Sequence, residues 1–543
     1  MKQIKIINNL NDGKNLVAKS LIYDKIHKQN INWLKQPDQG ESFNLNETIT
    51  GDLISDMFKI SIIYHNIDSS LTYDLGFGDA FDILKVALNG REINKSTLTS
   101  FVFDNDGDNV LDIYIDKDPN NENIDIHWND VSPSIDPVTV HISKYISNIP
   151  RLSNNIKRVI CDAPKIKIGN EIFSGTNIES FECNGVIEYI GDNAFRFCAN
   201  LKSIELKDGL QYIGNGAFDN SGLTGELTLP DSLTSIGDNA FKFCSYLTKL
   251  TLPNSITSIG DWVFYWCKGL TKLTLPNSLT SIGNGAFKDC SELTELTLPN
   301  SITVMGDNVF ESCTSLAKLT LPDSLISIGN NVFIGCRGLV ELILPDSITS
   351  IGNYAFEDCS GLAKLTLSNN LTSIGDHAFY YCSRLTELTL PDSLISIREY
   401  AFSNSGLTKL TLSNSLTSIG EYAFSECTGL TELTLPDSLT SIGDYAFAKL
   451  SGLTKLTLSN SLTSIGEFAF SECTGLTELI LPNSLKSIKY DAFEGCTNAI
   501  IYVPETIEYI SDSAFDGVKK VVLKNYKRFE YWEDWGATEV VEE

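Results

Sequence analysis

Phenylalanine recurs along most of this 543-residue chain at a nearly constant spacing. The step is 23 residues, with three steps of 22, through Phe173, Phe195, Phe218, Phe241, Phe264, Phe287, Phe310, Phe333, Phe356, Phe379, Phe402, Phe424, Phe447, Phe470, Phe493 and Phe515. A chain with such a short period cannot bury its apolar residues in one closed core, because only neighbouring units can cover each unit's apolar face. The spacing therefore predicts a solenoid of stacked units.

The first half of each unit has the alternation of a β-strand. In residues 430–452 the run Leu-Thr-Glu-Leu-Thr-Leu precedes a proline. Successive side chains of a strand point to opposite faces, so Leu433 and Leu435 are expected to point inward, and Glu432 and Thr434 outward. Stacked units then place these strands in one parallel sheet.

The second half of each unit reads as a turn followed by a short helical segment. Pro436 turns the chain, and Leu439 and Ile442 return to the interior. Asp444 follows a glycine and is a residue type that often caps the start of a helix. We therefore expect a short helical turn that carries Phe447 inward.

The pattern L-P-x-S-[IL]-x-x-I-G-x-x-A-F-x-x-C repeats in register between residues 156 and 524. This signature resembles the BspA-like subclass of leucine-rich repeats, and the period itself is typical of leucine-rich repeats. The resemblance implies an α/β solenoid with a parallel β-sheet on one side and short helical turns on the other. It also implies a protein of the kind found on host-associated bacteria, in protists and in some viruses, often an adhesin.

We expect four regions along the chain. Residues 1–40 form an N-terminal segment that is partly helical. Residues 41–150 form a small all-β module, a β-sandwich or jelly roll, because alternating segments take over there. Residues 151–524 form the solenoid, and residues 525–543 form a C-terminal cap or tail.

One loop of the N-terminal region is rich in aspartate: Asp104, Asp106, Asp108 and Asp112. It resembles a calcium loop of the thrombospondin type-3 kind, in which closely spaced carboxylates offer hard oxygen ligands. Asn109 and Ile115 stand where an EF-hand has Gly and Glu. A simple Asp-Gly hairpin turn explains the sequence as well. Calcium is therefore a candidate cofactor, and the sequence suggests no other.

Eleven of the 13 cysteines lie three residues after a repeat Phe, and the others are Cys161 and Cys183. Ser405 and Leu450 occupy the same slot in the units next to Cys427, so the slot accepts an apolar filler. Adjacent units would hold their Cβ atoms about 5 Å apart, outside the usual range for a disulfide. No C-x-x-C pair is present to support zinc. We expect reduced, buried cysteines.

The composition excludes several classes of function. The net charge is −28, from 41 Lys plus Arg and 69 Asp plus Glu. Nucleic acids and anionic membranes require clustered basic residues, so we expect neither as a partner, and no apolar run is long enough for membrane insertion. Asn and Asp residues interrupt the N-terminal sequence before an apolar stretch of signal-peptide length can form, so we expect no Sec signal peptide. The five His are scattered and catalytic motifs are missing, so we expect no enzyme.

The outward face of the predicted sheet carries charges of alternating sign. The row is Lys272, Glu295, Lys318, Glu341, Lys364, Glu387, Lys409, Glu432, Lys455 and Glu478, with a row of Thr beside it. Each charge then has opposite charges above and below it, which keeps the sheet soluble and in register. This face lacks the Trp, Tyr and Arg residues that dominate most binding sites.

Large aromatic residues gather instead at variable positions of a few units, and we take them as the candidate partner site: Phe243, Tyr246, Trp262, Tyr265, Trp266, Tyr380 and Tyr381. Tyr265 and Trp266 should point to solvent, because Lys288 and Asp289 hold their slots in the next unit. Packing against a neighbouring unit or the N-terminal module is the alternative, and Trp262 fits it best.

The leading functional hypothesis is a non-enzymatic adhesion or recognition protein. An extended repeat surface would bind a protein or glycan, and the N-terminal module would attach the chain to a larger assembly. Without a Sec signal the location would be a cell surface or a virion reached by another route. The alternative is a cytoplasmic scaffold that binds a partner protein.

Overall fold

The computed structural model describes residues 156–542, apart from 162, 525 and 530, and the backbone of the strands between residues 57 and 142. The chain divides into two compact units, Met1–Gly222 and Leu223–Glu543. The helical segment expected within residues 1–40 lies outside the described residues and stays a prediction.

The first unit contains a seven-stranded sheet in the order β10-β8-β7-β1-β6-β3-β4. Strand β1 pairs antiparallel with β6 and β7, whereas β7 with β8 and β8 with β10 are parallel. The first parallel strands of the repeat region thus continue an antiparallel sheet. The strands of this unit are β1 (Met57–Ile67), β2 (Thr72–Tyr73), β3 (Ile83–Leu88), β4 (Arg91–Ile93), β5 (Phe101–Val102), β6 (Gly107–Asp116), β7 (Val138–Ile142), β8 (Ile156–Cys161), β9 (Lys165–Ile168), β10 (Ser180–Cys183), β11 (Val186–Ile190) and β12 (Tyr212–Ile213).

Much of residues 41–150 lies outside the described residues. The β-sandwich or jelly roll expected there, and its boundary with the solenoid, therefore remain predictions.

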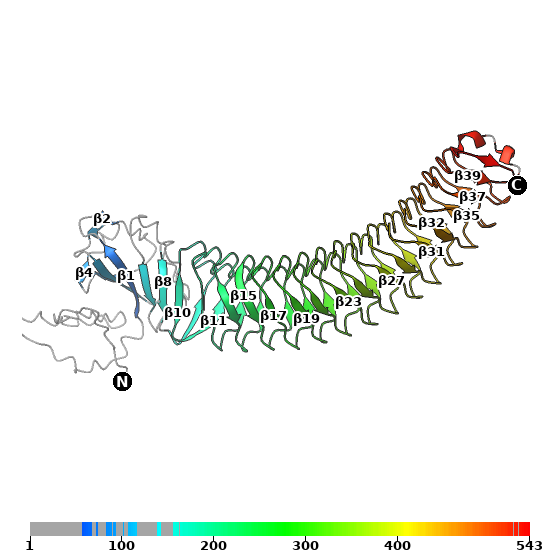
Figure 1. The fold of residues 1–543 in the computed structure, drawn as a ribbon. Coiled ribbons are helices and arrows are strands. Elements are labelled where there is room, and N and C mark those ends of the chain that lie inside the picture. The colour runs from blue at the N-terminus through cyan, green and yellow to red at the C-terminus, as the bar shows by residue number, and fades with distance from the viewer. Residues whose placement is uncertain are drawn as a thin grey trace, which may run out of the picture. The chain divides into compact units, whose positions relative to one another are not determined.

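The second unit is a stack of coils, each with a strand in a first column (Figure 1). Most neighbouring strands of this column pair in parallel and in register, and the column divides into five short sheets. Its members are β13 (Thr224–Thr228), β15 (Tyr246–Thr251), β17 (Lys272–Thr274), β19 (Glu295–Thr297), β21 (Lys318–Thr320), β23 (Glu341–Ile343), β25 (Lys364–Thr366), β27 (Glu387–Thr389), β29 (Lys409–Thr411), β31 (Glu432–Thr434), β33 (Lys455–Thr457), β35 (Glu478–Ile480), β37 (Ile500–Tyr502), β39 (Lys520–Val522) and β40 (Val540–Val541). The parallel solenoid predicted from the repeat is confirmed.

A second column of two-residue parallel strands, which the sequence analysis did not predict, follows the Pro turn of each coil. Its members are β14 (Ser235–Ile236), β16 (Ser258–Ile259), β18 (Ser281–Ile282), β20 (Val304–Met305), β22 (Ser327–Ile328), β24 (Ser350–Ile351), β26 (Ser373–Ile374), β28 (Ser396–Ile397), β30 (Ser418–Ile419), β32 (Ser441–Ile442), β34 (Ser464–Ile465), β36 (Ser487–Ile488) and β38 (Tyr509–Ile510). The second residue of each pair, Met305 in β20 and Ile in the others, is buried.

The segment expected to be a helical turn is a run of tight turns, and the described residues contain no α-helix. Tyr445, Phe447 and Lys449 donate their backbone N–H groups to the next coil, at 2.7, 2.9 and 2.7 Å. Ala446 and Ala448, between them, donate to the residue three positions back. Tyr445 and Lys449 have φ of 55° and 62°, the left-handed region. An α-helix would satisfy these backbone N–H groups within one coil, whereas here every second N–H group donates to a carbonyl oxygen of the neighbouring coil.

Asp444 therefore caps no helix. Its Oδ1 accepts a hydrogen bond from the backbone N–H of Glu467 in the next coil, at 2.8 Å. The same bond recurs along the stack. The side-chain oxygens of Asp238, Asp261, Asn284, Asp307 and Asn330 accept, respectively, from the backbone N–H groups of Asp261, Asn284, Asp307, Asn330 and Asn353. Asn or Asp occupies the slot in these coils, and both offer a short side-chain acceptor.

The repeat Phe side chains form a buried stack through the interior. In the second unit the centroids of neighbouring rings lie 5.2–5.7 Å apart, with nearly parallel planes. Burying one Phe contributes about 2 kcal/mol, and each ring contact adds roughly 0.5–1.5 kcal/mol. The recurrence of Phe in the sequence therefore corresponds to one ring in the buried stack for each coil.

The cysteine column lies beside this stack, and all 13 cysteines are free and buried. The Sγ atoms of Cys313 and Cys336 lie 3.3 and 3.2 Å from the carbonyl oxygens of Phe287 and Phe310, one coil earlier. The thiol is the donor of this bond, so the contact requires the reduced residue. Burial raises the pKa of the Cys336 thiol to about 12.

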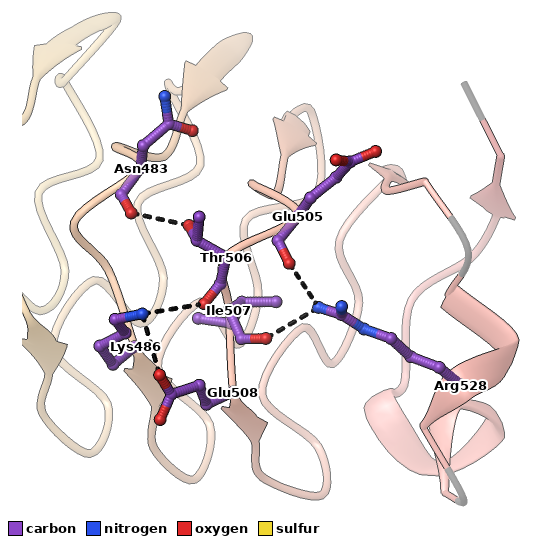
Figure 2. A network of polar contacts seen from close by, with 7 residues as sticks. All are labelled: Asn483, Lys486, Glu505, Thr506, Ile507, Glu508 and Arg528. Atoms are coloured by element: carbon purple, nitrogen blue, oxygen red, sulfur yellow. Dashed lines mark hydrogen bonds and ion pairs between the residues drawn. The ribbon is translucent and has the colours of Figure 1, made fainter.

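The last coil is closed by the chain that follows β39. Two 3-10 helices, Tyr526–Arg528 and Trp532–Trp535, precede β40, and Trp535 is 1% exposed with its ring 6.0 Å from that of Phe515. Arg528 donates to the carbonyl oxygens of Glu505 and Ile507, both at 2.8 Å, beside the final strand of the second column (Figure 2). The guanidinium thus takes the place of side-chain hydroxyl donors that the next coil supplies elsewhere, as Ser484 does for the carbonyl oxygen of Leu462 at 2.7 Å. Lys486 and Glu508 form an ion pair at 2.9 Å in the same network.

The side-chain bonds between coils can be tested at Asp307, which accepts from the N–H of Asn330 at 2.8 Å. Asp307→Ala should speed hydrogen exchange at the Asn330 amide by roughly fivefold, because a bond of this kind contributes about 1 kcal/mol. Asp307→Asn keeps the acceptor and should exchange like the parent. Equal exchange rates in the Ala variant and the parent would contradict the assignment.

The cysteine column predicts a difference between the folded and the unfolded protein. In the folded protein at pH 8 the thiols should resist alkylation, because burial and the raised pKa keep them protonated and the thiolate is the reactive form. After unfolding without a reductant, all 13 cysteines should be alkylated, as counted by mass spectrometry. Disulfides at most of these positions would be the contrary result.

Candidate partner-binding surface

Four of the predicted aromatic residues come together on the turn segments of two adjacent coils. The ring centroid of Phe243 lies 5.3 Å from that of Tyr265 and 5.4 Å from that of Trp266, and Trp262 lies 5.3 Å from Tyr265. We call these four residues the tryptophan cluster. The backbone N–H of Phe243 donates to the carbonyl of Tyr265 at 2.8 Å, so the bonding between coils sets the spacing of the rings.

Lysine side chains cover part of the tryptophan cluster. The Lys268 ammonium lies 3.6 Å from the centroid of the Trp266 ring, and Lys242 lies 5.3 Å from Phe243 and 5.6 Å from Tyr265. A cation over an aromatic face is stabilised by the ring quadrupole. Trp266 remains 36% exposed. The surface therefore combines large rings with flexible cations that a ligand could displace or use.

Trp262 packs between coils, as the alternative reading expected. A Cβ atom built on Gly285 of the next coil would lie 2.3 Å from the indole ring, so the glycine makes room for it. Trp266 and Phe243 take φ of 63° and 59° and turn away from the core. Trp262 thus supports the cluster, Trp266 is its exposed member, and Phe243, Trp262 and Tyr265 are half-buried.

The other predicted aromatic residues lie elsewhere. Tyr246 is the first residue of β15, in the first strand column, and is 64% exposed. Tyr380 and Tyr381 contact each other, with ring centroids 4.3 Å apart, several coils beyond the tryptophan cluster. The structure therefore divides the seven candidates among three places.

Tyr380 and Tyr381 lie beside a longer aromatic array that the sequence analysis did not recognise as a surface. We call it the tyrosine row: Tyr354, His377, Tyr400, Tyr422, Tyr445, Phe468 and Tyr490. Neighbouring rings from Tyr354 to Phe468 stack at 4.4–4.7 Å, and Tyr490 meets Phe468 edge-on at 5.7 Å. Burial lowers the pKa of His377, which favours the neutral ring. The signal in the sequence was an aromatic residue two positions before the repeat Phe in six consecutive units, from Tyr354 to Phe468, whereas Tyr490 stands three positions before Phe493.

The first strand column carries the alternating charges in register. Glu387 stands opposite Lys409, and Glu432 opposite Lys455, with 3.8 Å between the charged atoms of the latter pair. Both side chains of that pair are 71% exposed, so each such pair contributes at most about 1 kcal/mol. The charges of this face are matched within the chain.

The aspartate-rich loop lies partly outside the described residues. Asp108 and Asp112 belong to β6, and Asp104 and Asp106 are not described. Calcium binding there stays a prediction. Within the described residues, no three His, Cys, Asp or Glu side chains come together as a metal site.

A model of the BspA type leucine rich repeat region matches residues 166–294, 224–339, 280–408 and 395–522, which together span more than half of the chain. The chain belongs to the BspA-type leucine-rich repeat family. The family assigned from the repeat signature is thus confirmed, while no curated protein matches the sequence. No helix in the described part of the chain is long and apolar enough to span a membrane.

Solved structures of bacterial leucine-rich repeat proteins are similar to this chain. One from Bacteroides ovatus is 31% identical, with a TM-score of 0.57 over 61% of this chain and 88% of that one. A leucine rich cell surface protein from Faecalibacterium prausnitzii is 26% identical, with a TM-score of 0.35 over 61% and 83%. The pneumococcal vaccine antigen PcpA is 20% identical, with a TM-score of 0.33 over 73% and 85%. Only the first score indicates a shared overall chain path.

Proposed function

We propose that this protein is a non-enzymatic recognition protein that binds a protein or glycan partner through its turn segments. The observation that carries the proposal is the tryptophan cluster. Large, partly exposed rings are the usual centres of binding energy, and Trp266 is exposed in a repeat whose same slot holds polar residues elsewhere. The first strand column offers a partner less, because opposite charges alternate in register along it.

The location that we propose is the surface of a cell or of a virion, with the N-terminal module attached to a larger assembly. Membership of the BspA-type family supports this location, because the family resemblance implies surface proteins and adhesins. The cytoplasmic scaffold is the competing location. Immunogold labelling of the organism that makes the protein should place gold on the outer surface, and labelling confined to the cytosol would replace the surface role by the scaffold.

The tryptophan cluster predicts which side of the solenoid the partner touches. A photo-crosslinking amino acid in place of Trp266 should capture the partner, and the same amino acid in place of Glu341 on β23 should not. The two positions are matched controls because both are exposed positions of regular coils. Capture from Glu341 alone would place the binding face on the strands.

The same site predicts an energetic effect. Tyr265→Ala combined with Trp266→Ala should weaken binding of the captured partner by about 1–2 kcal/mol, or roughly 5–30-fold, as measured by calorimetry. Glu341→Lys should change the affinity little, because it alters one exposed ion pair. Circular dichroism of both variants checks that the fold is intact. A large loss in Glu341→Lys with none in the double variant would contradict the assignment.

A further inference from the structure

The rings of the tyrosine row cover one another's faces and are half-buried between His377 and Phe468. Each ring between His377 and Tyr445 stacks on both neighbours at 4.4–4.7 Å, so its two faces are covered. These residues also take φ between 52° and 57°, a conformation that favours Gly, Asn or Asp. Asn239, Asn308 and Asn331 do occupy the same slot in other coils, with φ of 58–61°. The coil therefore folds without an aromatic ring in this slot, and six consecutive coils, from Tyr354 to Phe468, nevertheless carry one.

A row of carboxylates runs beside the tyrosine row, one from each of five consecutive coils. We call it the acidic row: Asp376, Glu399, Glu421, Asp444 and Glu467. The backbone N–H groups of Tyr400, Tyr422 and Tyr445 donate to the carbonyl oxygens of Glu421, Asp444 and Glu467, at 2.9, 3.0 and 2.7 Å. The bonding between coils thus fixes the two rows next to each other. These coils carry β25 to β34 and lie between the labels β23 and β35 in Figure 1.

The acidic row contrasts with the charges on the strand side of the same coils. There the sign alternates, with Glu387 opposite Lys409 and Glu432 opposite Lys455. In the acidic row the same sign repeats in consecutive coils, and like charges so placed repel. Opposite charges thus alternate on the strand side, whereas carboxylates of one sign follow one another on the turn side.

The local electrostatics agree with this description. Burial, and then the carboxylates of Glu399 and Asp444, raise the pKa of the Glu421 carboxyl. Asp444 has an ion pair with Lys489 at 3.3 Å, and Asp376 has one with Arg398 at 3.6 Å. Within the described residues, Glu399, Glu421 and Glu467 form no ion pair and are exposed. A cationic ligand would relieve the repulsion among them.

We propose that the tyrosine row and the acidic row together form a docking strip for an extended, basic polypeptide segment of another protein. This inference rests on the proposed function and adds the chemistry of the partner. Arg and Lys side chains can lay their apolar stems on ring edges and reach carboxylates with their charged ends. Six steps of about 4.8 Å between Tyr354 and Tyr490 span roughly 29 Å, which fits about nine extended residues.

The test uses two synthetic peptides of about ten residues, one alternating Arg with Ser and one alternating Gln with Ser. Fluorescence anisotropy measures their binding to the full chain at about 0.15 M salt, where long-range attraction is screened. The Arg peptide should bind, and it should bind at least about tenfold more tightly than the Gln peptide. Equal binding of the two peptides would overturn the proposal.

A matched pair of variants separates the strip from the general negative charge of the chain. The first changes Glu399, Glu421 and Glu467 to Gln, and the second changes Glu341, Glu387 and Glu432 of the strand side to Gln. Both remove three carboxylates. The first should weaken binding of the Arg peptide by about tenfold, and the second by less than about twofold. Equal losses would show attraction to net charge alone and would overturn the proposal.

The rings are tested by the substitutions Tyr400→Asn, Tyr422→Asn and Tyr445→Asn in one chain. This variant should fold, because Asn fills the slot in natural coils with the same φ. It should also weaken binding of the Arg peptide by at least about fivefold. Unchanged affinity in a folded variant would remove the rings from the site.

Another copy of this chain is the competing occupant, because residues 1–36 hold seven Lys and two Asp. A synthetic peptide of residues 1–36 that binds the strip more tightly than the Arg peptide would identify a second copy and overturn the choice of a foreign partner. Cross-linking from Trp266 is independent of all these variants. If the Arg peptide does not bind the strip while cross-linking from Trp266 still captures a partner, this inference is refuted and the proposed function stands.

Discussion

The backbone hydrogen bonds between the turn segments of neighbouring coils are the constraint on which the rest of the structure depends. Every second residue of a turn donates to the coil that follows, as Tyr445, Phe447 and Lys449 do. This arrangement requires left-handed residues at fixed positions and holds the coils close together. A Cβ atom on Gly375, for example, would lie 2.5 Å from the carbonyl carbon of Gly352, so the close approach needs glycine there.

The same constraint divides each coil into residues that serve the stack and residues that are free to vary. Phe, Cys, Leu and Ile fill the interior, and Asp or Asn links one coil to the next. The remaining turn positions face outward at a fixed spacing, so a substitution there changes the surface with little effect on the fold. Recognition residues can therefore accumulate on the turns, and the tryptophan cluster, the tyrosine row and the acidic row all lie there.

The sequence was sufficient for the repeat, its inward columns and the free cysteines, because each of these recurs at one slot and its chemistry is local. It was insufficient for the turn geometry. Gly443 followed by Asp444 resembles a helix start when read locally, and the true partner of Asp444, the N–H of Glu467, belongs to another coil. The second strand column was missed for a similar reason, since a two-residue strand such as β32 has too short a pattern to detect.

The candidate site was predictable in part. Tyr265 and Trp266 stood out because their slots are polar in the next unit, and the structure brings them together with Phe243 and Trp262. Tyr246 was grouped with them by sequence proximity, although it begins a strand. Tyr422 and Tyr445 were not among the predicted site residues. Their significance lies in their alignment with the acidic row, which depends on the register between coils.

The central claim is that recognition takes place on the turn segments and not on the strands. Chemical footprinting of tyrosines, compared between the free chain and its complex with the partner captured at Trp266, tests this claim most directly. Tyr265 on a turn and Tyr246 on β15 belong to neighbouring coils and provide an internal comparison. The account predicts that the partner protects Tyr265 from modification and leaves Tyr246 as reactive as in the free chain. Protection of Tyr246 with no change at Tyr265 would contradict it.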